Sequence, residues 1–283
     1  MIRWLYTRIQ YLSLDVVAGA MASGGMSAWA LGVRMPLTWW IALPLGVWAV
    51  YTADHLIDAF RLREMAHTER HLFHYHYFGP ILTGWVIIVV GGGIYLLGSA
   101  PAALLQAGLA GGITSGLHFL LIRLAGGRTS RLLIKELGVG FIYTAGVWGS
   151  PGVLFPAAVS AGWWIAAGAF FLVVMFNLLL FSLFELTSDT LDGHTSFVRA
   201  IGARSARRLL WGLGVGMTLL AGWLVLTGVP AWTRTGSTLL LMGGVHMGLL
   251  ATEGWSRQHN RYRYVGDAAF MLPGWIWIIA GQG

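Results

Sequence analysis

Two pairs of acidic residues have a spacing that would let their side chains act together. Asp54 and Asp58 lie in YTADHLIDAF, and Glu185 and Asp189 lie in FELTSDTLDG. A helix places residues four apart on one face, so each pair would present two carboxylates one turn apart. Such carboxylates repel each other at low dielectric, and a hard cation between their oxygens relieves the repulsion. Mg²⁺ is the favoured cation because it binds a few carboxylates together with water and phosphate oxygens.

The residues after each pair extend this chemistry. Arg61 comes one turn after Asp58, and Asp192 follows Asp189. A Mg²⁺–diphosphate would neutralise the carboxylates, and arginines of the adjoining segments would hold the remaining phosphate oxygens. A single acidic pair at a helix end is usually a solvated cap. Because the pair recurs at the ends of two long apolar segments, a shared anion and metal site is the favoured interpretation.

A histidine-rich segment, HTERHLFHYHYFG at 67–79, lies between the two acidic pairs. His67, His71 and His74 have the spacing of a single helix face, which could bind a transition metal. His55 is a possible further ligand, and imidazole suits Zn, Fe or Mn better than Mg. The favoured interpretation is an amphipathic helix at the membrane interface, with its histidine, tyrosine and phenylalanine side chains at headgroup depth. Contact of the histidines with a diphosphate is a further alternative.

The elements that must position these residues are membrane helices. The chain of 283 residues is 57% hydrophobic and 10% charged, whereas charged residues make up about a quarter of soluble domains. Apolar stretches of about 20 residues recur along it, and each is long enough to cross a bilayer. The 40 glycines suit close helix packing in lipid. Cysteine is absent, which excludes disulfides and thiolate chemistry.

We therefore predict an all-α, polytopic membrane protein with a single integral membrane domain over 1–283. Nine spans are expected, at 11–31, 37–60, 80–98, 101–123, 133–150, 162–184, 206–228, 236–252 and 265–281. The acidic pairs then end the second and sixth spans. Cap segments are expected at about 61–79 and 190–205. Tryptophans near span ends are expected in interfacial belts, namely Trp39, Trp40, Trp163 and Trp164. Polar residues inside spans are expected to form interhelical hydrogen bonds, namely His118, Asn177 and His246.

The basic residues predict the orientation of these spans. With the N-terminus in the cytoplasm, all but two of the 18 lysines and arginines fall on the cytoplasmic side, the exceptions being Arg34 and Arg234. The positive-inside rule then places the N-terminus inside and the C-terminus outside. A basic face toward anionic headgroups accounts for the net charge of +7. We expect the cytoplasmic membrane of a bacterium or archaeon, membrane lipid as the surroundings, no nucleic acid and no obligate protein partner.

Around its acidic pairs the sequence resembles the UbiA superfamily of intramembrane prenyltransferases. The first motif of that family runs Asn-Asp-x-x-Asp-x-x-x-Asp, with a threonine and an arginine further on. The matching positions here are Asp54 for the Asn, His55, Asp58 and Leu62 for the three Asp residues, then Thr68 and Arg70. The second motif runs Asp-x-x-x-Asp-x-x-x-Gly, then Thr and Gly. The matching positions are Glu185, Asp189, Gly193, Ser196 and Gly202. Lys135 and Glu136 resemble a polar helix start of the family.

The resemblance implies a fold, a site and a reaction. The fold would be nine transmembrane helices around a central cavity. Mg²⁺ would be held by Asp54, Asp58, Glu185 and Asp189, with His55 as an added ligand. Residues implied in diphosphate binding are Arg61, Arg70, Thr68, Asp192 and Lys135. The enzyme would transfer an isoprenoid group from a Mg²⁺-bound isoprenyl diphosphate to a lipophilic or aromatic acceptor.

Two alternatives stay open, because the first motif departs from the family at three positions. The first is a non-catalytic protein of the UbiA fold that binds a lipid or a quinone. The second is a histidine-rich membrane metalloprotein with Zn, Fe or Mn at His55, His67, His71 and His74.

Overall fold

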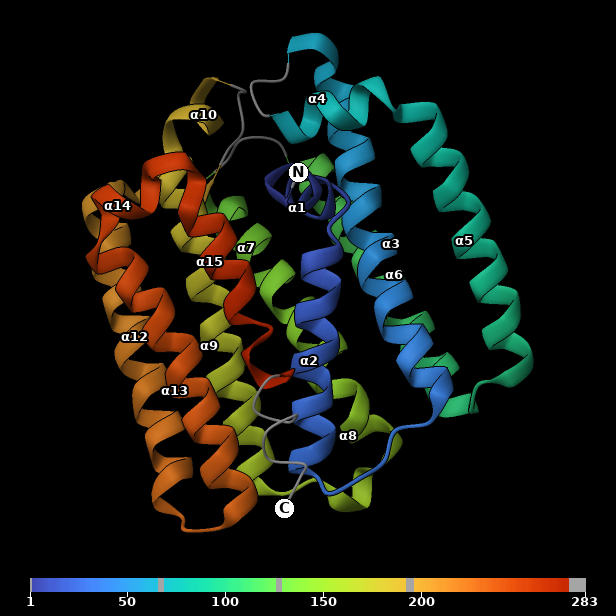
Figure 1. The fold of residues 1–283 in the computed structure, drawn as a ribbon, viewed down its shortest axis with the longest axis vertical. Coiled ribbons are helices and arrows are strands. Elements are labelled where there is room, and N and C mark those ends of the chain that lie inside the picture. The colour runs from blue at the N-terminus through green and yellow to red at the C-terminus, as the bar shows by residue number, and fades with distance from the viewer. Residues whose placement is uncertain (1, 66–68, 126–128, 192–195, 275–283) are drawn as a thin grey trace.

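The computed structural model describes residues 2–65, 69–125, 129–191 and 196–274, and all regular structure in these residues is helical (Figure 1). The all-α prediction is confirmed. The long helices are α2 (Leu14–Ala30), α3 (Leu37–Leu62), α5 (Phe78–Ser99), α6 (Ala102–Ala125), α7 (Thr129–Thr144), α9 (Ala161–Phe184), α12 (Ala203–Leu226) and α13 (Pro230–Ala251). The short elements before α9 are α1 (Ile2–Tyr11), η1 (Arg63–Met65), α4 (Glu69–His76), η2 (Ala145–Gly149), α8 (Ser150–Leu154) and η3 (Pro156–Ala158). Those after α9 are α10 (Leu186–Leu191), α11 (Phe197–Ile201), α14 (Glu253–Arg257), η4 (Gln258–Asn260) and α15 (Arg261–Ala269).

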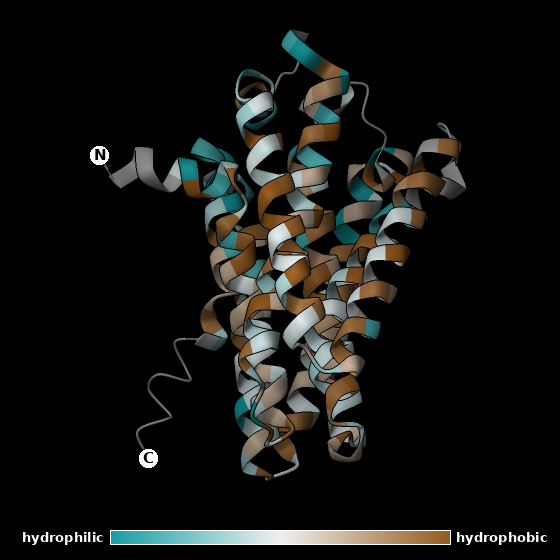
Figure 2. Ribbon diagram, turned by 90° about the vertical axis from the view of Figure 1, so that its right-hand side faces the viewer, coloured by the Kyte–Doolittle hydropathy of each residue, from teal (hydrophilic) through white to brown (hydrophobic). Residues whose placement is uncertain are grey.

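The protein is an integral membrane protein. Six helical segments in the described ranges are long and apolar enough to cross a bilayer: Leu37–Leu62, Phe78–Ser99, Ala102–Ile122, Ile134–Leu154, Ala161–Phe184 and Ala203–Leu226. Hydrophobic residues dominate the shafts of the long helices, and hydrophilic residues gather at the end of the bundle that carries α1 and α4 (Figure 2). That end is also where α3 and α9 finish (Figure 1).

Two predicted spans differ from the observed helices. The first, at 11–31, is divided, because Ser13 has a left-handed backbone (φ 55°) and α1 turns away across the end of α2 (Figure 2). The ninth, at 265–281, is interrupted in its described part: α15 ends at Ala269, the Met271 N–H closes a turn onto the Ala268 carbonyl, and residues 272–274 are helical again. Pro273 lies in the first turn of this second helical stretch, where proline is tolerated because the first N–H groups of a helix have no intrahelical partner. Residues 275–281 lie outside the described part.

The fifth predicted span, at 133–150, is a composite of α7, the π-helical η2 and α8. Pro151 removes one helical N–H and crowds the carbonyl four residues earlier, which is a known cause of local helix distortion. The distorted turn buries Trp148, whose carbonyl accepts a 2.8 Å hydrogen bond from Ser27 Oγ of α2. The π-turn thereby joins α7 to α2.

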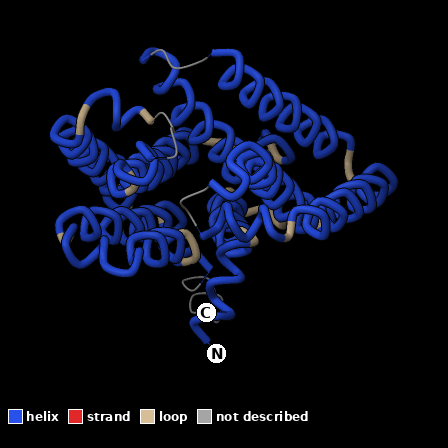
Figure 3. Tube along the Cα trace, turned by 90° about the horizontal axis from the view of Figure 1, so that it is seen from above, coloured by secondary structure: helices blue, strands red, loops and turns tan. Residues whose placement is uncertain are grey.

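Helix α9 packs against α7, α12 and α13. Seen from above, the described residues form a bundle built of helices and loops (Figure 3). Phe170 and Val173 of α9, Met217 of α12 and Met242 of α13 are fully or almost fully buried together. Polar contacts add to this packing: His246 Nε2 of α13 lies 3.1 Å from the side-chain amide oxygen of Asn177. The predicted interhelical hydrogen bond is thus confirmed for this pair.

The belt prediction is wrong for Trp39 and Trp163, which are buried in the core. Their indole N–H groups donate to Ser150 Oγ (2.9 Å) and Ser27 Oγ (3.0 Å), so each ring has an interior hydrogen-bond partner. A buried indole needs such a partner. Trp164 is 65% exposed, as expected of a belt residue.

Candidate functional site

Asp54 and Asp58 lie on the uninterrupted helix α3, as their spacing predicts. Both are half-buried, and Leu62 is the last residue of the helix. Asp58 has two weak ion pairs of 3.8 Å, from Oδ1 to Arg61 Nη2 and from Oδ2 to His71 Nε2. These distances exceed those of direct hydrogen bonds. The Arg61 side chain is 57% exposed, so this arginine lies at the outer rim of the site.

Glu185 lies at a break in the chain rather than inside a helix, so the expected continuous helix through Glu185 and Asp189 is wrong. Helix α9 ends at Phe184, Glu185 has non-helical dihedral angles (φ −98°, ψ 6°), and α10 begins at Leu186. The backbone of Asp189 belongs to α10. Its side chain lies outside the described part of the structure, as do residues Thr68, Asp192 and His67 altogether.

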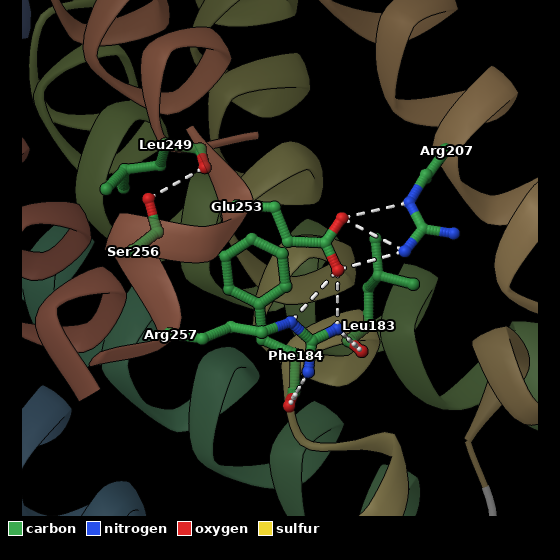
Figure 4. A network of polar contacts seen from close by, with 7 residues as sticks. All are labelled: Leu183, Phe184, Arg207, Leu249, Glu253, Ser256 and Arg257. Atoms are coloured by element: carbon green, nitrogen blue, oxygen red, sulfur yellow. Dashed lines mark hydrogen bonds and ion pairs between the residues drawn. The ribbon is translucent and has the colours of Figure 1, made fainter. Parts of the chain in front are cut away.

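Arg257 explains why α9 ends here. Its Nη1 donates to the Phe184 carbonyl (2.9 Å) and its Nη2 to the Leu183 carbonyl (3.3 Å; Figure 4). The last carbonyls of a helix have no intrahelical partner, and an arginine is a favourable cap for them because of the helix dipole. The guanidinium therefore stabilises the end of α9 next to Glu185.

Glu253 holds Arg257 in this position (Figure 4). Its carboxylate accepts from Arg257 Nε at 2.9 Å and from Arg207 Nη2 at 2.9 Å, so one acidic residue links α12 and α14 to the end of α9. The hydrogen bonds from Arg207 lower the pKa of Glu253, with a smaller contribution from Arg257. Arg207, Glu253 and Arg257 thus form a charged network that contacts the main chain just before Glu185.

Two residues of α15 hold the Glu185 side chain. Arg263 Nη2 lies 2.6 Å from Glu185 Oε1, and the Tyr262 hydroxyl donates to the same oxygen at 2.8 Å. The ion pair is largely buried, with 23% and 18% of the two side chains exposed. Burial acts to lower the pKa of Arg263, but Glu185, Tyr262 and Asp267 together outweigh burial, so that this pKa is raised.

Arg70 of α4 is close enough to both acidic ends to interact with them electrostatically. It acts electrostatically on Asp54 of α3 and also on Glu185 after α9. Burial lowers the pKa of Arg70, and the nearby Arg263 lowers it further. Within the described residues its guanidinium has no hydrogen-bonded carboxylate. Lys135 of α7 also acts electrostatically on Asp54.

Three histidines pack together where α3 meets α4. The His55 ring centroid lies 5.1 Å from that of His74 and 6.3 Å from that of His71. His55 is 5% exposed, and neither of its ring nitrogens has a hydrogen-bond partner in the described residues. His74 Nδ1 donates to the Arg70 carbonyl at 3.0 Å, and burial lowers the pKa of His74. The interfacial prediction is wrong for His71 and His74, because both are buried against α3.

The histidine and acidic side chains of the described residues can be compared with what a transition metal and Mg²⁺ each require. In the described ranges, no three histidine or acidic side chains are arranged so that they could hold a metal ion. A transition-metal site, which needs about four protein ligands when structural, is therefore not assembled from the described histidines. Mg²⁺ has a smaller requirement, since one or two carboxylates plus substrate phosphates suffice. Asp54 and Asp58, one turn apart on α3, have the donor chemistry for that mode of binding.

The segment after α13, RQHNRYRY at 257–264, is favoured from the sequence as a headgroup-facing loop, with contact to the diphosphate as the alternative. That sequence reasoning did not single out the residues of this segment that contact the end of α9 and Glu185, which are Arg257, Tyr262 and Arg263. Arg263 and Asp267 are four residues apart, a spacing that indicates a helix with the two charged side chains on one face, and this spacing could have identified Arg263 as part of a charged site. Asp267 acts electrostatically on Arg263 and, across the helices, on Arg70.

No family model and no curated protein matches the chain. Among solved structures, it is similar to the apo structure of a UbiA homolog from Aeropyrum pernix K1. The TM-score is 0.66 and the sequence identity 16%, over 95% of this chain and 98% of that one. The chain therefore has the fold of that UbiA homolog, and the UbiA-like all-α fold that the resemblance implies is confirmed.

Proposed function

We propose, on the premise of this shared fold, that the protein is an intramembrane prenyltransferase of the UbiA superfamily. It transfers an isoprenoid group from a Mg²⁺-bound isoprenyl diphosphate to a lipophilic or aromatic acceptor. A fold alone does not determine an activity, so the proposal depends on the site. The observation that carries it is the position of Arg70, a half-buried guanidinium that acts on the acidic residues of both α3 and the end of α9.

The charges at this end of the bundle suit a metal–diphosphate better than either ion alone. The carboxylates of Asp54, Asp58 and Glu185 would repel a free diphosphate, while Arg70 and Lys135 would repel a free cation. A Mg²⁺–diphosphate presents positive charge to the carboxylates and negative oxygens to the basic residues. Charge-assisted hydrogen bonds to phosphate are among the stronger ones that a protein makes.

The proposed roles follow from these positions. Asp54, Asp58, Glu185 and Asp189 bind the metal, whose charge stabilises the diphosphate as it leaves. Arg70 and Lys135 hold phosphate oxygens. Residues that would flank the diphosphate are Arg61, Thr68 and Asp192. His55 is not among the proposed metal ligands, because its buried ring lies beside His71 and His74 and these described histidines are not arranged so that they could hold a metal ion. The apolar helices would keep the isoprenoid tail and the acceptor away from water.

Ligand-dependent stability of purified protein in detergent tests the proposal. Geranylgeranyl diphosphate with Mg²⁺ should raise the Tm, because a ligand at a hundredfold excess over its Kd stabilises the fold by about 2.7 kcal/mol. Mg²⁺ removal with EDTA should abolish the rise. Asp58→Asn should abolish it too while leaving the ligand-free Tm nearly unchanged, since the ion pairs of Asp58 are weak.

Glu64→Gln is the matched control, because Glu64 is an exposed acidic residue six positions beyond Asp58. It should keep the full response. A Tm rise that survives in Asp58→Asn would contradict the site. An absence of any response across several prenyl chain lengths would instead favour the non-catalytic lipid- or quinone-binding protein.

A further inference from the structure

Glu185, one of the proposed metal ligands, already has a buried cation against its carboxylate. Arg263 Nη2 lies 2.6 Å from Glu185 Oε1, a distance typical of a short charge-assisted hydrogen bond. The Tyr262 hydroxyl donates to the same oxygen. An inner-sphere metal would need this oxygen or would need to share the carboxylate with the guanidinium. The two cations are thus in competition.

The main chain of Glu185 is held independently of this ion pair. Arg257 binds the carbonyls of Leu183 and Phe184, and Glu253 fixes Arg257 (Figure 4). The Glu185 side chain could therefore change its partner while the end of α9 stays in place. Breaking a buried pair without replacing the lost charge is strongly unfavourable, so any exchange must supply a new cation.

Arg263 also has other partners within reach. Asp267, one turn further along α15, acts electrostatically on it, and Arg70 lies near enough to interact with both Arg263 and Glu185. A guanidinium released from Glu185 would enter a region where a phosphate group can bind two arginines. Planar guanidinium groups suit that kind of recognition.

We propose that Arg263 is a positioning residue that holds the Glu185 carboxylate until Mg²⁺ takes its place, and that it then binds phosphate oxygens beside Arg70. This inference rests on the proposed diphosphate site. It assigns α15 a part in substrate binding, with Arg263 preventing Mg²⁺ alone from occupying Glu185 tightly. Metal and diphosphate would then bind together rather than separately.

A titration of Mg²⁺ alone, read by the Tm in detergent, tests the competition without any catalysis. In Arg263→Gln the Mg²⁺ concentration needed for half of the stabilisation should fall at least about fivefold, the lower end of usual coupling between sites. In the same variant, geranylgeranyl diphosphate at saturating Mg²⁺ should bind more weakly than in the wild type. Arg263→Lys keeps the charge and should restore much of the wild-type Mg²⁺ dependence.

Arg261→Gln is the matched control, since Arg261 begins the same helix and contacts Gln258 rather than Glu185. It should leave both titrations unchanged. Should Arg263→Gln fold poorly, Glu185→Gln provides the second test, because adding Arg263→Gln to it should no longer alter the Mg²⁺ dependence.

The outcomes separate this inference from the proposed function. An unchanged or higher Mg²⁺ midpoint in Arg263→Gln overturns the role of Arg263, even where the wild type binds Mg²⁺–diphosphate. A lower midpoint in a protein that binds no isoprenyl diphosphate supports the competition at Glu185 and overturns the prenyltransferase proposal instead.

Discussion

His74 of α4 is buried against α3, and its burial makes the stability of the folded protein depend on pH. Burial lowers its pKa below the ordinary value of 6.5, so an unfolded chain takes up the proton first as the pH falls. The contribution of this residue to stability is therefore complete above pH 6.5 and is lost as the pH falls from there through the folded-state pKa. We expect the Tm in detergent to drop over that interval, and to drop less in His74→Asn.

An equal drop in His74→Asn would show that other groups cause the acid sensitivity. His76 provides the control at the same scale, because it is exposed on the same helix. His76→Asn should keep the wild-type profile.

Arg263 and Glu185 show what a residue's type can and cannot reveal. An arginine in a short polar loop is most often solvated, and apart from its spacing of four from Asp267 nothing local distinguishes Arg263 from Arg261. Yet Arg263 is paired with a buried glutamate, whereas Arg261 contacts Gln258 and lies over the Trp255 ring. The difference arises only because α15 packs beside the end of α9.

Helices α12 and α13 approach each other closely, and one glycine makes this approach possible. A Cβ at Gly236 would lie 2.5 Å from the Ala221 carbonyl oxygen, a backbone atom that cannot move without shifting α12. Gly236→Ala should destabilise the protein by about 1–3 kcal/mol, the usual cost of overpacking. This exceeds the roughly 0.5–1 kcal/mol that alanine gains over glycine within a helix. The Tm in detergent measures it.

Gly244→Ala, on the same helix, is the matched control, because nothing lies within 4 Å of the added Cβ. That variant should be neutral or slightly more stable. Equal changes in Tm for the two substitutions would mean that helix propensity, and not packing between α12 and α13, determines the effect of alanine in α13.

The ends of elements were harder to predict than their shafts. The hydrophobic run that forms α9 extends to Phe184, and the helical spacing of the acidic residues favours continuation beyond it. The helix nevertheless ends there, because Arg257, 73 residues away from Phe184, takes up the terminal carbonyls. Similarly, Pro151 marks a distorted turn locally, but the burial of Trp148 in that turn depends on α2.

At the scale of the whole molecule, the charge distribution predicts that the end carrying α1 and α4 faces the cytoplasm. The absence of cysteine allows a direct test by single-cysteine labelling. Glu64 in η1 and Ala157 in η3 are both exposed and belong to opposite ends of the bundle (Figure 1). A membrane-impermeant maleimide should label Ala157→Cys in intact cells, and Glu64→Cys only after permeabilisation. The reverse pattern would invert the orientation and move the proposed site to the outer side.

The sequence by itself determined the membrane class, the all-helical fold and the position of most long helices, because apolar run length and helical spacing are local properties. It also placed Asp54 and Asp58 on one helix face. Tertiary structure decided the rest: the burial of Trp39, His71 and His74, the break at Glu185, and its pairing with Arg263. These features depend on which helices become neighbours, and a side chain's neighbours are set by packing between segments far apart in the chain.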